Sequence, residues 1–257
     1  MALMRTSNPA LGQNTFNDFA RSQYGGNLID ASARMTLSGT VNKTGVLLLC
    51  VVVTAAWTWS SFMGTRDLSM AGPALLLGSI GGLIFALITT FKKEWAPVTA
   101  PIYALLEGLV LGGLSAFFEM RFPGIAFQAV GLTFGTLFIL LLAYKSGMIR
   151  ATQKFRLGVF AATGGIMAFY FLQMILGFFG FRFATLNGSG PIGIGISLFI
   201  VAIAALNLVL DFDFVEQGVR SGAPKYMEWY AAFGIMVTLV WLYMEMLRLL
   251  SKVRSRN

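Results

Sequence analysis

The hydrophobic pattern divides the chain into seven long apolar segments separated by short polar ones. The segments cover residues 41–62, 69–90, 98–120, 123–143, 157–179, 192–213 and 226–250. Each has close to the ~20 residues that a helix needs to cross the hydrocarbon core of a bilayer. The runs are continuous, whereas the strands of a membrane barrel alternate apolar and polar residues. The pattern therefore predicts an all-α integral membrane protein, a bundle of seven transmembrane helices.

Polar residues gather at the two ends of the chain. Residues 1–35 are rich in Asn and Ser and lack the apolar core of a signal peptide. We expect this stretch to be an N-terminal tail, either mobile or forming a short surface helix. Residues 36–252 then make up the seven-helix membrane domain, and residues 253–257 a basic C-terminal tail.

The amino-acid composition excludes several classes of functional site. In this chain of 257 residues, 56% of the residues are hydrophobic and only 12% are charged. In soluble domains, about a quarter of the residues are charged. It has no His and a single Cys, Cys50, which excludes His-based metal sites, Ser-His catalysis and an intramolecular disulfide. We therefore expect no enzyme and no resident cofactor. Although the net charge is +8, no basic helix with interleaved aromatics occurs, so we expect no nucleic-acid partner.

The basic residues predict the orientation in the membrane. With a cytoplasmic N-terminus, one side of the membrane carries Arg5, Arg21, Arg34, Lys43, Lys92, Lys93, Lys145, Arg150, Lys154, Arg156, Arg220 and Lys225. The other side carries only Arg66, Arg121 and Arg182 between helices. Cytoplasmic loops are enriched in Lys and Arg, so the bias favours this orientation. It leaves open the side of the basic C-terminal end, since seven full spans place it outside and a re-entrant seventh segment places it inside.

Three segments contain the GxxxG pattern, in the pairs Gly78–Gly82, Gly108–Gly112 and Gly131–Gly135. Small residues four apart give a helix a flat face on which a second helix can approach closely. We expect these faces to form tight contacts within the bundle or a dimer face. Glycine is also simply common in membrane helices, which would account for a chance match.

Glu107 is the acid that lies deepest in an apolar segment, within PIYALLEGLVLGGL. Acids inside a membrane cost roughly 2.5–3.5 kcal/mol each on insertion scales, so they are candidates for function. Pro101, six residues earlier, can locally open the helical hydrogen bonds. Glu107 is either a proton or cation site, or a protonated carboxyl bonded to a neighbouring helix.

A second group of acids follows the sixth segment, in LNLVLDFDFVEQG. Asn207 and Asp211 are four residues apart, so on a helix they share a face that we expect to look into the bundle. Asp213 lies on another stripe and fits the rim. The next helix begins soon after and contributes Glu228. We expect Asp211 and Glu228 to meet, where they would share a proton or bind a cation such as Ca²⁺.

Glu245 and Arg248 are three residues apart near the end of the last segment. This spacing is typical of a local ion pair on a helix, and we interpret it as a structural pair.

Several of these stretches resemble the Bax inhibitor-1 family of membrane proteins, and most closely a bacterial branch of it. The resemblance covers roughly residues 36–250, and it rests on VNKTGVLLL, KKEWAPVTAPIYALLEGLVLGG, SGMIRATQKFRLGVFAATGGI, ALNLVLDFDFVEQG and APKYMEWYAAFGIMVTLVWLYMEMLRLLSK. It implies a seven-helix bundle with a central, buried last helix in the bacterial inner membrane. It also implies a pH-sensitive Ca²⁺ leak channel, which an aspartate pair on the last two helices closes, and one bacterial relative is associated with a membrane-bound AAA protease.

The resemblance carries over to single residues. Asp211 matches the first aspartate of the pair, and Glu107 with Gly108 matches an acid-glycine motif of the third helix. The second aspartate is expected midway along the last helix, where residues 234–238 contain no acid. The nearest acids there are Glu228 and Glu245.

Three functions fit these observations. The first is a leak channel for Ca²⁺ or protons, gated by protonation of carboxylates near Asp211. The second is an interaction protein that modulates a membrane protease or another membrane complex, with or without forming a homo-oligomer. The third is a secondary transporter, which Glu107 favours and the lack of an internal repeat disfavours.

Overall fold

The computed structural model describes residues 33–65, 68–180 and 188–256. Most of the predicted N-terminal tail therefore lies outside the described residues. Within these ranges the chain forms seven long helices and no β-strand, so the predicted fold class is confirmed. The helices are α2 Leu37–Thr65, α3 Leu68–Phe91, α4 Ala96–Arg121, α5 Ile125–Lys145, α6 Gln153–Phe178, α8 Pro191–Arg220 and α9 Met227–Arg254, and a short 3₁₀ turn, η3 Lys93–Trp95, precedes α4.

All seven helices are long and apolar enough to span a bilayer. The shortest, α5, has 21 residues and the longest, α8, has 30, which correspond to about 32 and 45 Å at 1.5 Å per residue. α8 and α9 therefore extend beyond their predicted ends at residues 213 and 250. α9 is one continuous helix of 28 residues, which favours a full span over a re-entrant segment.

Local signals in the sequence explain where several helices begin and end. Gly124 precedes α5 with a φ of 81°, a left-handed conformation that glycine adopts without strain. Gly147 adopts a φ of 75° in the turn after α5. Thr152 then caps α6, because its side chain accepts a hydrogen bond from the backbone N–H of Phe155 at 3.3 Å.

The chain divides into two compact units, which are described separately. The α2–α4 unit comprises the described residues of 33–121 and residues 211–237, and the α5–α6 unit comprises those of 122–210 and residues 238–256. α8 and α9 each contribute one part to each unit.

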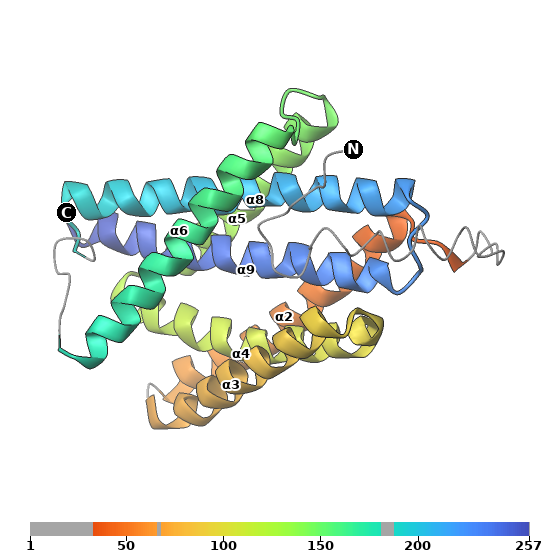
Figure 1. Ribbon diagram of the computed structural model, residues 1–257. Coiled ribbons are helices and arrows are strands. Elements are labelled where there is room, and N and C mark those ends of the chain that lie inside the picture. The colour runs from red at the N-terminus through yellow and green to blue at the C-terminus, as the bar shows by residue number, and fades with distance from the viewer. Residues whose placement is uncertain (1–32, 66–67, 181–187, 257) are drawn as a thin grey trace. The chain divides into compact units, whose positions relative to one another are not determined.

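Glycines bring the helices of the α2–α4 unit into close contact. α4 packs against both α2 and α3 (Figure 1). A Cβ atom added at Gly112 would lie 2.8 Å from Cα of Ala55 on α2, and one added at Gly78 would lie 2.6 Å from the carbonyl oxygen of Leu106 on α4. Two of the three GxxxG pairs therefore contribute glycines to tight packing. In the third pair, Gly131 and Gly135 on α5 have no atom within 4 Å of an added Cβ.

The α5–α6 unit has its own apolar core between α6, α8 and α9. Ile166 of α6 packs with Ile200 and Ile203 of α8, and Trp241 of α9 borders this cluster. Further along, the buried Lys252 of α9 donates a hydrogen bond to the carbonyl oxygen of Gly193 on α8, at 3.1 Å. Trp241 of α9 thus lies near Ile200 and Ile203 of α8, whereas the later residue Lys252 lies near the earlier residue Gly193. The two helices therefore run antiparallel in this unit.

α8 and α9 are the most buried helices. In their most apolar windows 56% and 50% of the residues are buried, against 11–22% in α2, α3, α5 and α6. The resemblance implied a central last helix, and α8 shares this buried character. The outer helices instead expose large apolar side chains such as Phe91, Phe127 and Ile139, as expected for surfaces that face lipid.

The last residues of the predicted tail belong with the α2–α4 unit. Arg34 pairs with Pro224 in an antiparallel bridge, in which Met35 N donates to Ala223 O at 2.7 Å and Lys225 N donates to Ala33 O at 2.8 Å. Met35 is 2% exposed. The segment before α2 is therefore fastened to the connection between α8 and α9.

Replacing Gly112 with Ala is expected to destabilise the protein by about 1–3 kcal/mol, because the added methyl group meets the backbone of α2. The measurement is thermal unfolding of the purified protein in detergent, followed by circular dichroism. Gly135→Ala is the matched control and is expected to be neutral or slightly stabilising, since its Cβ meets open space. Equal effects of both substitutions would contradict the close α2–α4 contact.

Candidate functional site

Asp211 is buried within a continuous helix. The structure extends α8 to Arg220, so Asp211 lies more than two turns before the helix end, and the predicted end at residue 213 is corrected. Only 2% of the surface of Asp211 is exposed. A buried carboxylate on a membrane-spanning helix is costly, and such residues usually mark an ion or proton pathway.

The contact between α8 and α9 sets the depth of Asp211 in the α2–α4 unit. Phe214 of α8 lies against Tyr230 of α9, with ring centroids 6.4 Å apart. In an antiparallel pair, Asp211 is then level with Phe233, whereas Glu228 is level with Glu216. Asp211 and Glu228 are thus offset by about five residues, or 7–8 Å along the helix axis. The two carboxylates that were expected to meet lie at different depths.

Glu228 instead receives hydrogen bonds from the start of α2. The residue is 0% exposed, in the first turn of α9, where the helix dipole favours a negative charge. Its Oε1 accepts bonds from the backbone N–H and the hydroxyl of Thr36, both at 2.8 Å. The same hydroxyl accepts a hydrogen bond from Gly39 N at 3.0 Å, so Thr36 caps α2 while it binds Glu228.

Two lysines complete the surroundings of Glu228. Lys43 of α2 forms an ion pair with its Oε2, and Nζ of Lys225 lies 3.1 Å from its Oε1. Gly39 leaves the space that the carboxylate occupies, because a Cβ added there would overlap it. With two ammonium groups already beside it, Glu228 is a poor position for a further cation such as Ca²⁺.

Asp213 and Glu216 form local contacts along α8. The half-buried Asp213 accepts a hydrogen bond from Nε2 of Gln217 at 2.5 Å. Glu216 pairs with Arg220 at 2.6 Å, and both side chains are well exposed. Each pair is four residues apart, so it occupies a single face of the helix.

Glu107 lies on α4 beside α3 and Tyr103. Tyr103 is hydrogen-bonded to its carboxylate, and Oε2 of Glu107 lies 3.4 Å from the position of an added Cβ at Gly82. The Tyr103 ring also packs edge-on against Phe233 of α9, with centroids 5.1 Å apart. Because Phe233 is level with Asp211, Tyr103 lies near the depth of Asp211 in the α2–α4 unit, and its bonded Glu107 lies about one turn further along α4.

Asn207 and the Glu245–Arg248 pair belong to the α5–α6 unit. The buried Asn207 donates through Nδ2 to the hydroxyl of Thr163 on α6 and to the carbonyl oxygen of Ile203, both at 2.8 Å. Its amide thus joins α8 to α6.

The predicted ion pair between Glu245 and Arg248 is present, at 2.8 Å. Glu245 is 2% exposed, and its Oε1 also accepts a hydrogen bond from the hydroxyl of Tyr170 on α6 at 2.8 Å. Arg248 donates to the same hydroxyl and lies over the Tyr170 ring. Sequence reasoning missed Tyr170, whose only signal was a phenol within an apolar segment.

Within the described residues, no group of three or more His, Cys, Asp or Glu residues is arranged to hold a metal ion.

A family model described as Bax inhibitor 1 like matches residues 8–255, nearly the whole chain. No curated protein and no solved structure matches the chain.

Replacing Glu228 with Gln is expected to lower stability by about 2–3 kcal/mol, because it removes the charge that two lysines and Thr36 surround. The measurement is chemical or thermal unfolding in detergent. Glu216→Gln is the matched control and should change stability by under about 1 kcal/mol, since its pair with Arg220 is exposed. The assignment fails if the control is destabilised as much as Glu228→Gln.

Proposed function

The chain belongs to the Bax inhibitor 1 like family, and from this we propose that it forms a cation leak pathway across the membrane, gated at Asp211. The permeant ion in this proposal is Ca²⁺ or a proton. The observation that carries the proposal is the burial of Asp211, which is 2% exposed, within a membrane-spanning helix and more than two turns before its end. Protonation of this group changes the charge that a passing cation meets.

The surroundings of Asp211 support Glu107 as the second acid of the gate. The resemblance implies a second aspartate on the last helix, but that level of α9 holds Phe233. Tyr103 lies against Phe233 and is hydrogen-bonded to Glu107. In this proposal the carboxylates of Asp211 and Glu107 titrate as a coupled pair, so the gate responds to pH without a histidine.

Glu228 has a different role in this proposal. Four donors hold its carboxylate at the junction of α2 and α9. It would keep the α8–α9 connection fastened to α2, and its loss would affect stability before it affects ion selectivity. Asp213 would contribute negative charge at the rim of the pathway.

A second candidate is an interaction protein without transport, which would bind a membrane protease or another membrane complex. The observation that favours it is the lack of an acid on α9 opposite Asp211, where Phe233 stands. Such a partner would be recognised through the lipid-exposed faces of the outer helices. A membrane-bound AAA protease is the partner class that the resemblance suggests.

Ca²⁺ flux into proteoliposomes of the purified protein tests the proposal. The wild type is expected to pass Ca²⁺ at rates that differ between acidic and alkaline pH. Asp211→Asn should make the two rates equal, and Glu107→Gln should reduce the difference, since each removes a titrating group. Glu216→Gln is the control and should behave like the wild type.

The same assay separates the two candidates. If no variant and no wild-type preparation passes Ca²⁺ or protons at either pH, the channel proposal fails. The carboxylate of Asp211 would then be structural, and co-purification of a membrane protease with the wild-type chain would support the interaction function.

A further inference from the structure

The end of the α5–α6 hairpin carries four basic residues in a stretch without acids. Lys145 ends α5, Arg150 lies in the turn, and Lys154 and Arg156 occupy the first turn of α6. Between Glu119 and Asp211 the sequence contains no Asp or Glu. This group of four is called the hairpin patch below.

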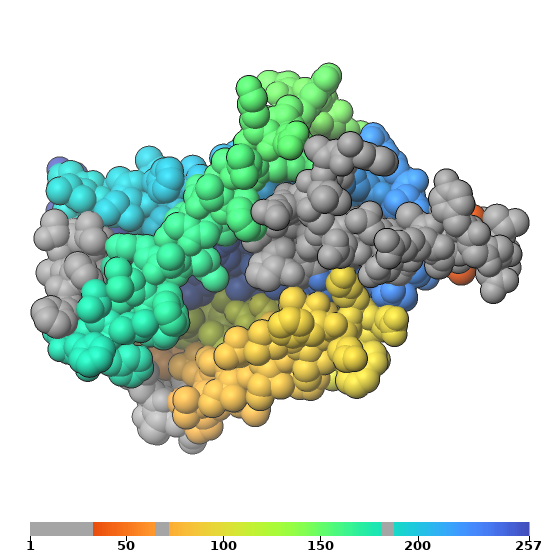
Figure 2. All heavy atoms as spheres, viewed as in Figure 1, coloured from red at the N-terminus to blue at the C-terminus, as the bar shows by residue number. Residues whose placement is uncertain are grey.

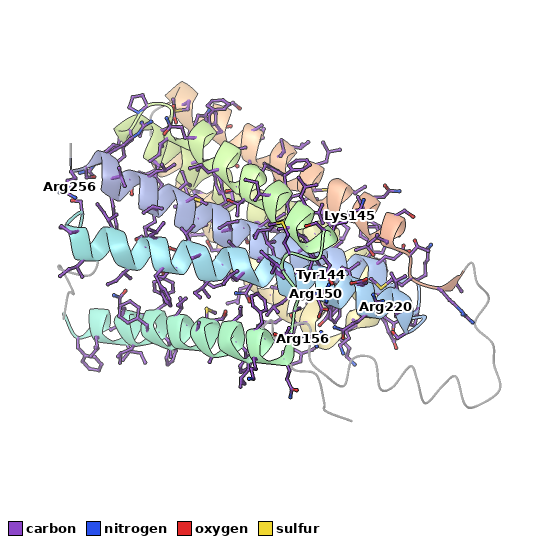
Figure 3. All side chains as sticks on the ribbon, turned by 90° about the horizontal axis from the view of Figure 1, so that it is seen from above. Tyr144, Lys145, Arg150, Arg156, Arg220 and Arg256 are labelled. Carbon is purple, nitrogen blue, oxygen red and sulfur yellow. The ribbon has the colours of Figure 1, made fainter. Side chains whose placement is uncertain are left out.

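The hairpin patch is at the surface of the α5–α6 unit. Lys145, Arg150 and Lys154 are exposed, and Arg156 is half-buried. Figure 2 shows this end of the hairpin, in green, at the molecular surface, and Figure 3 shows Lys145, Arg150 and Arg156 on the two helix ends and the turn that joins them. The patch is thus accessible to a partner.

The turn itself has a defined conformation. Ile149 N donates to Ala143 O at 3.1 Å, Nε of Arg150 donates to Gly147 O at 3.3 Å, and Thr152 caps α6. Gly147 allows the tight reversal with its left-handed backbone. The basic side chains are therefore presented from a fixed turn.

Apolar surface next to the patch locates it relative to the bilayer. Leu142 on α5 is 65% exposed and Leu157 on α6 is 66% exposed, each within about one turn of a basic residue of the patch. Met148, at the tip of the turn, is 83% exposed. On a membrane-spanning hairpin such side chains contact lipid tails, so the patch lies at the level of the lipid headgroups.

Four basic residues elsewhere in the described part of the chain form ion pairs with acids. Lys43 and Lys225 pair with Glu228, Arg220 with Glu216, and Arg248 with Glu245. In each pair, the carboxylate offsets much of the positive charge that would otherwise attract an anion from the surroundings. Lys145, Arg150 and Lys154 stand at exposed positions in a stretch of sequence without acids, so they add positive charge to this surface.

From this arrangement we propose that the hairpin patch is a docking surface for anionic phospholipid headgroups. Lys and Arg bind the phosphate groups, while Met148 and the adjacent leucines contact the acyl chains. This binding is independent of ion conduction and holds whether or not the protein forms a leak pathway. It would anchor the free end of the hairpin at one leaflet.

Lipid binding to the full chain in detergent tests the proposal, with native mass spectrometry counting bound molecules. Phosphatidylglycerol and phosphatidylcholine are titrated separately into the wild type. We expect preferential binding of phosphatidylglycerol that weakens as salt is added. In the variant Lys145→Gln with Lys154→Gln, affinity should fall by about fivefold for each charge removed.

The matched control is Lys92→Gln with Arg220→Gln, which makes the same change of net charge at exposed positions near Glu94 and Glu216. It should keep the wild-type preference for phosphatidylglycerol. The proposal is overturned if both double variants lose the preference equally, or if the hairpin variant retains it.

Two further arms identify the ligand. Inorganic phosphate at the concentration of the lipid should not displace phosphatidylglycerol, and displacement would mean that the patch binds a free ion. A soluble acidic peptide that binds the patch more tightly than phosphatidylglycerol would assign it to a protein partner and would also overturn the proposal. The unfolding temperature of each variant is measured first, and Lys154→Gln alone gives a milder version of the test.

Discussion

A carboxylate that is buried inside a membrane protein needs hydrogen-bond donors, cations or a proton, and this constraint organises the described part of the molecule. Thr36 donates hydrogen bonds to the Glu228 carboxylate, and two lysines form ion pairs with it. These contacts fasten the start of α2 to the start of α9. Glu245 meets the same constraint with Tyr170 and Arg248, which connect α6 to α9. In each unit, a buried acid on α9 thus holds an outer helix in place.

Asp211 and Glu107 are placed by close helix packing in the same unit. Glycines let the backbones of α2, α3 and α4 approach one another, and Gly82 leaves room beside the Glu107 carboxylate. Tyr103 then connects Glu107 to Phe233, which is level with Asp211. The proposed gate therefore depends on small residues as much as on charged ones, because a methyl group at Gly78, Gly108 or Gly112 would push the helices apart.

Much of the fold could be predicted because the bilayer restricts the backbone conformations that can cross it. A continuous apolar segment of about 20 residues in lipid must satisfy its backbone hydrogen bonds internally, so it forms a helix. All seven segments are helices, although α8 and α9 continue past their predicted ends because acidic and basic residues also favour helix once a partner helix packs beside them. The Glu245–Arg248 pair was predictable for the same local reason, since residues three apart share a helix face.

The sequence by itself determined the number and type of the elements, the acids that lie in apolar surroundings and the membership of the family. Only the tertiary structure decided which donors each acid meets. Lys43 is 185 residues from Glu228 and Tyr170 is 75 residues from Glu245, so no local pattern could connect them. The depth of Asp211 relative to Glu228 also depends on how α8 and α9 are aligned, and that alignment follows from contacts such as Phe214 with Tyr230. Helix formation is a local property of the chain, whereas side-chain partners in a bundle are set by packing between distant segments.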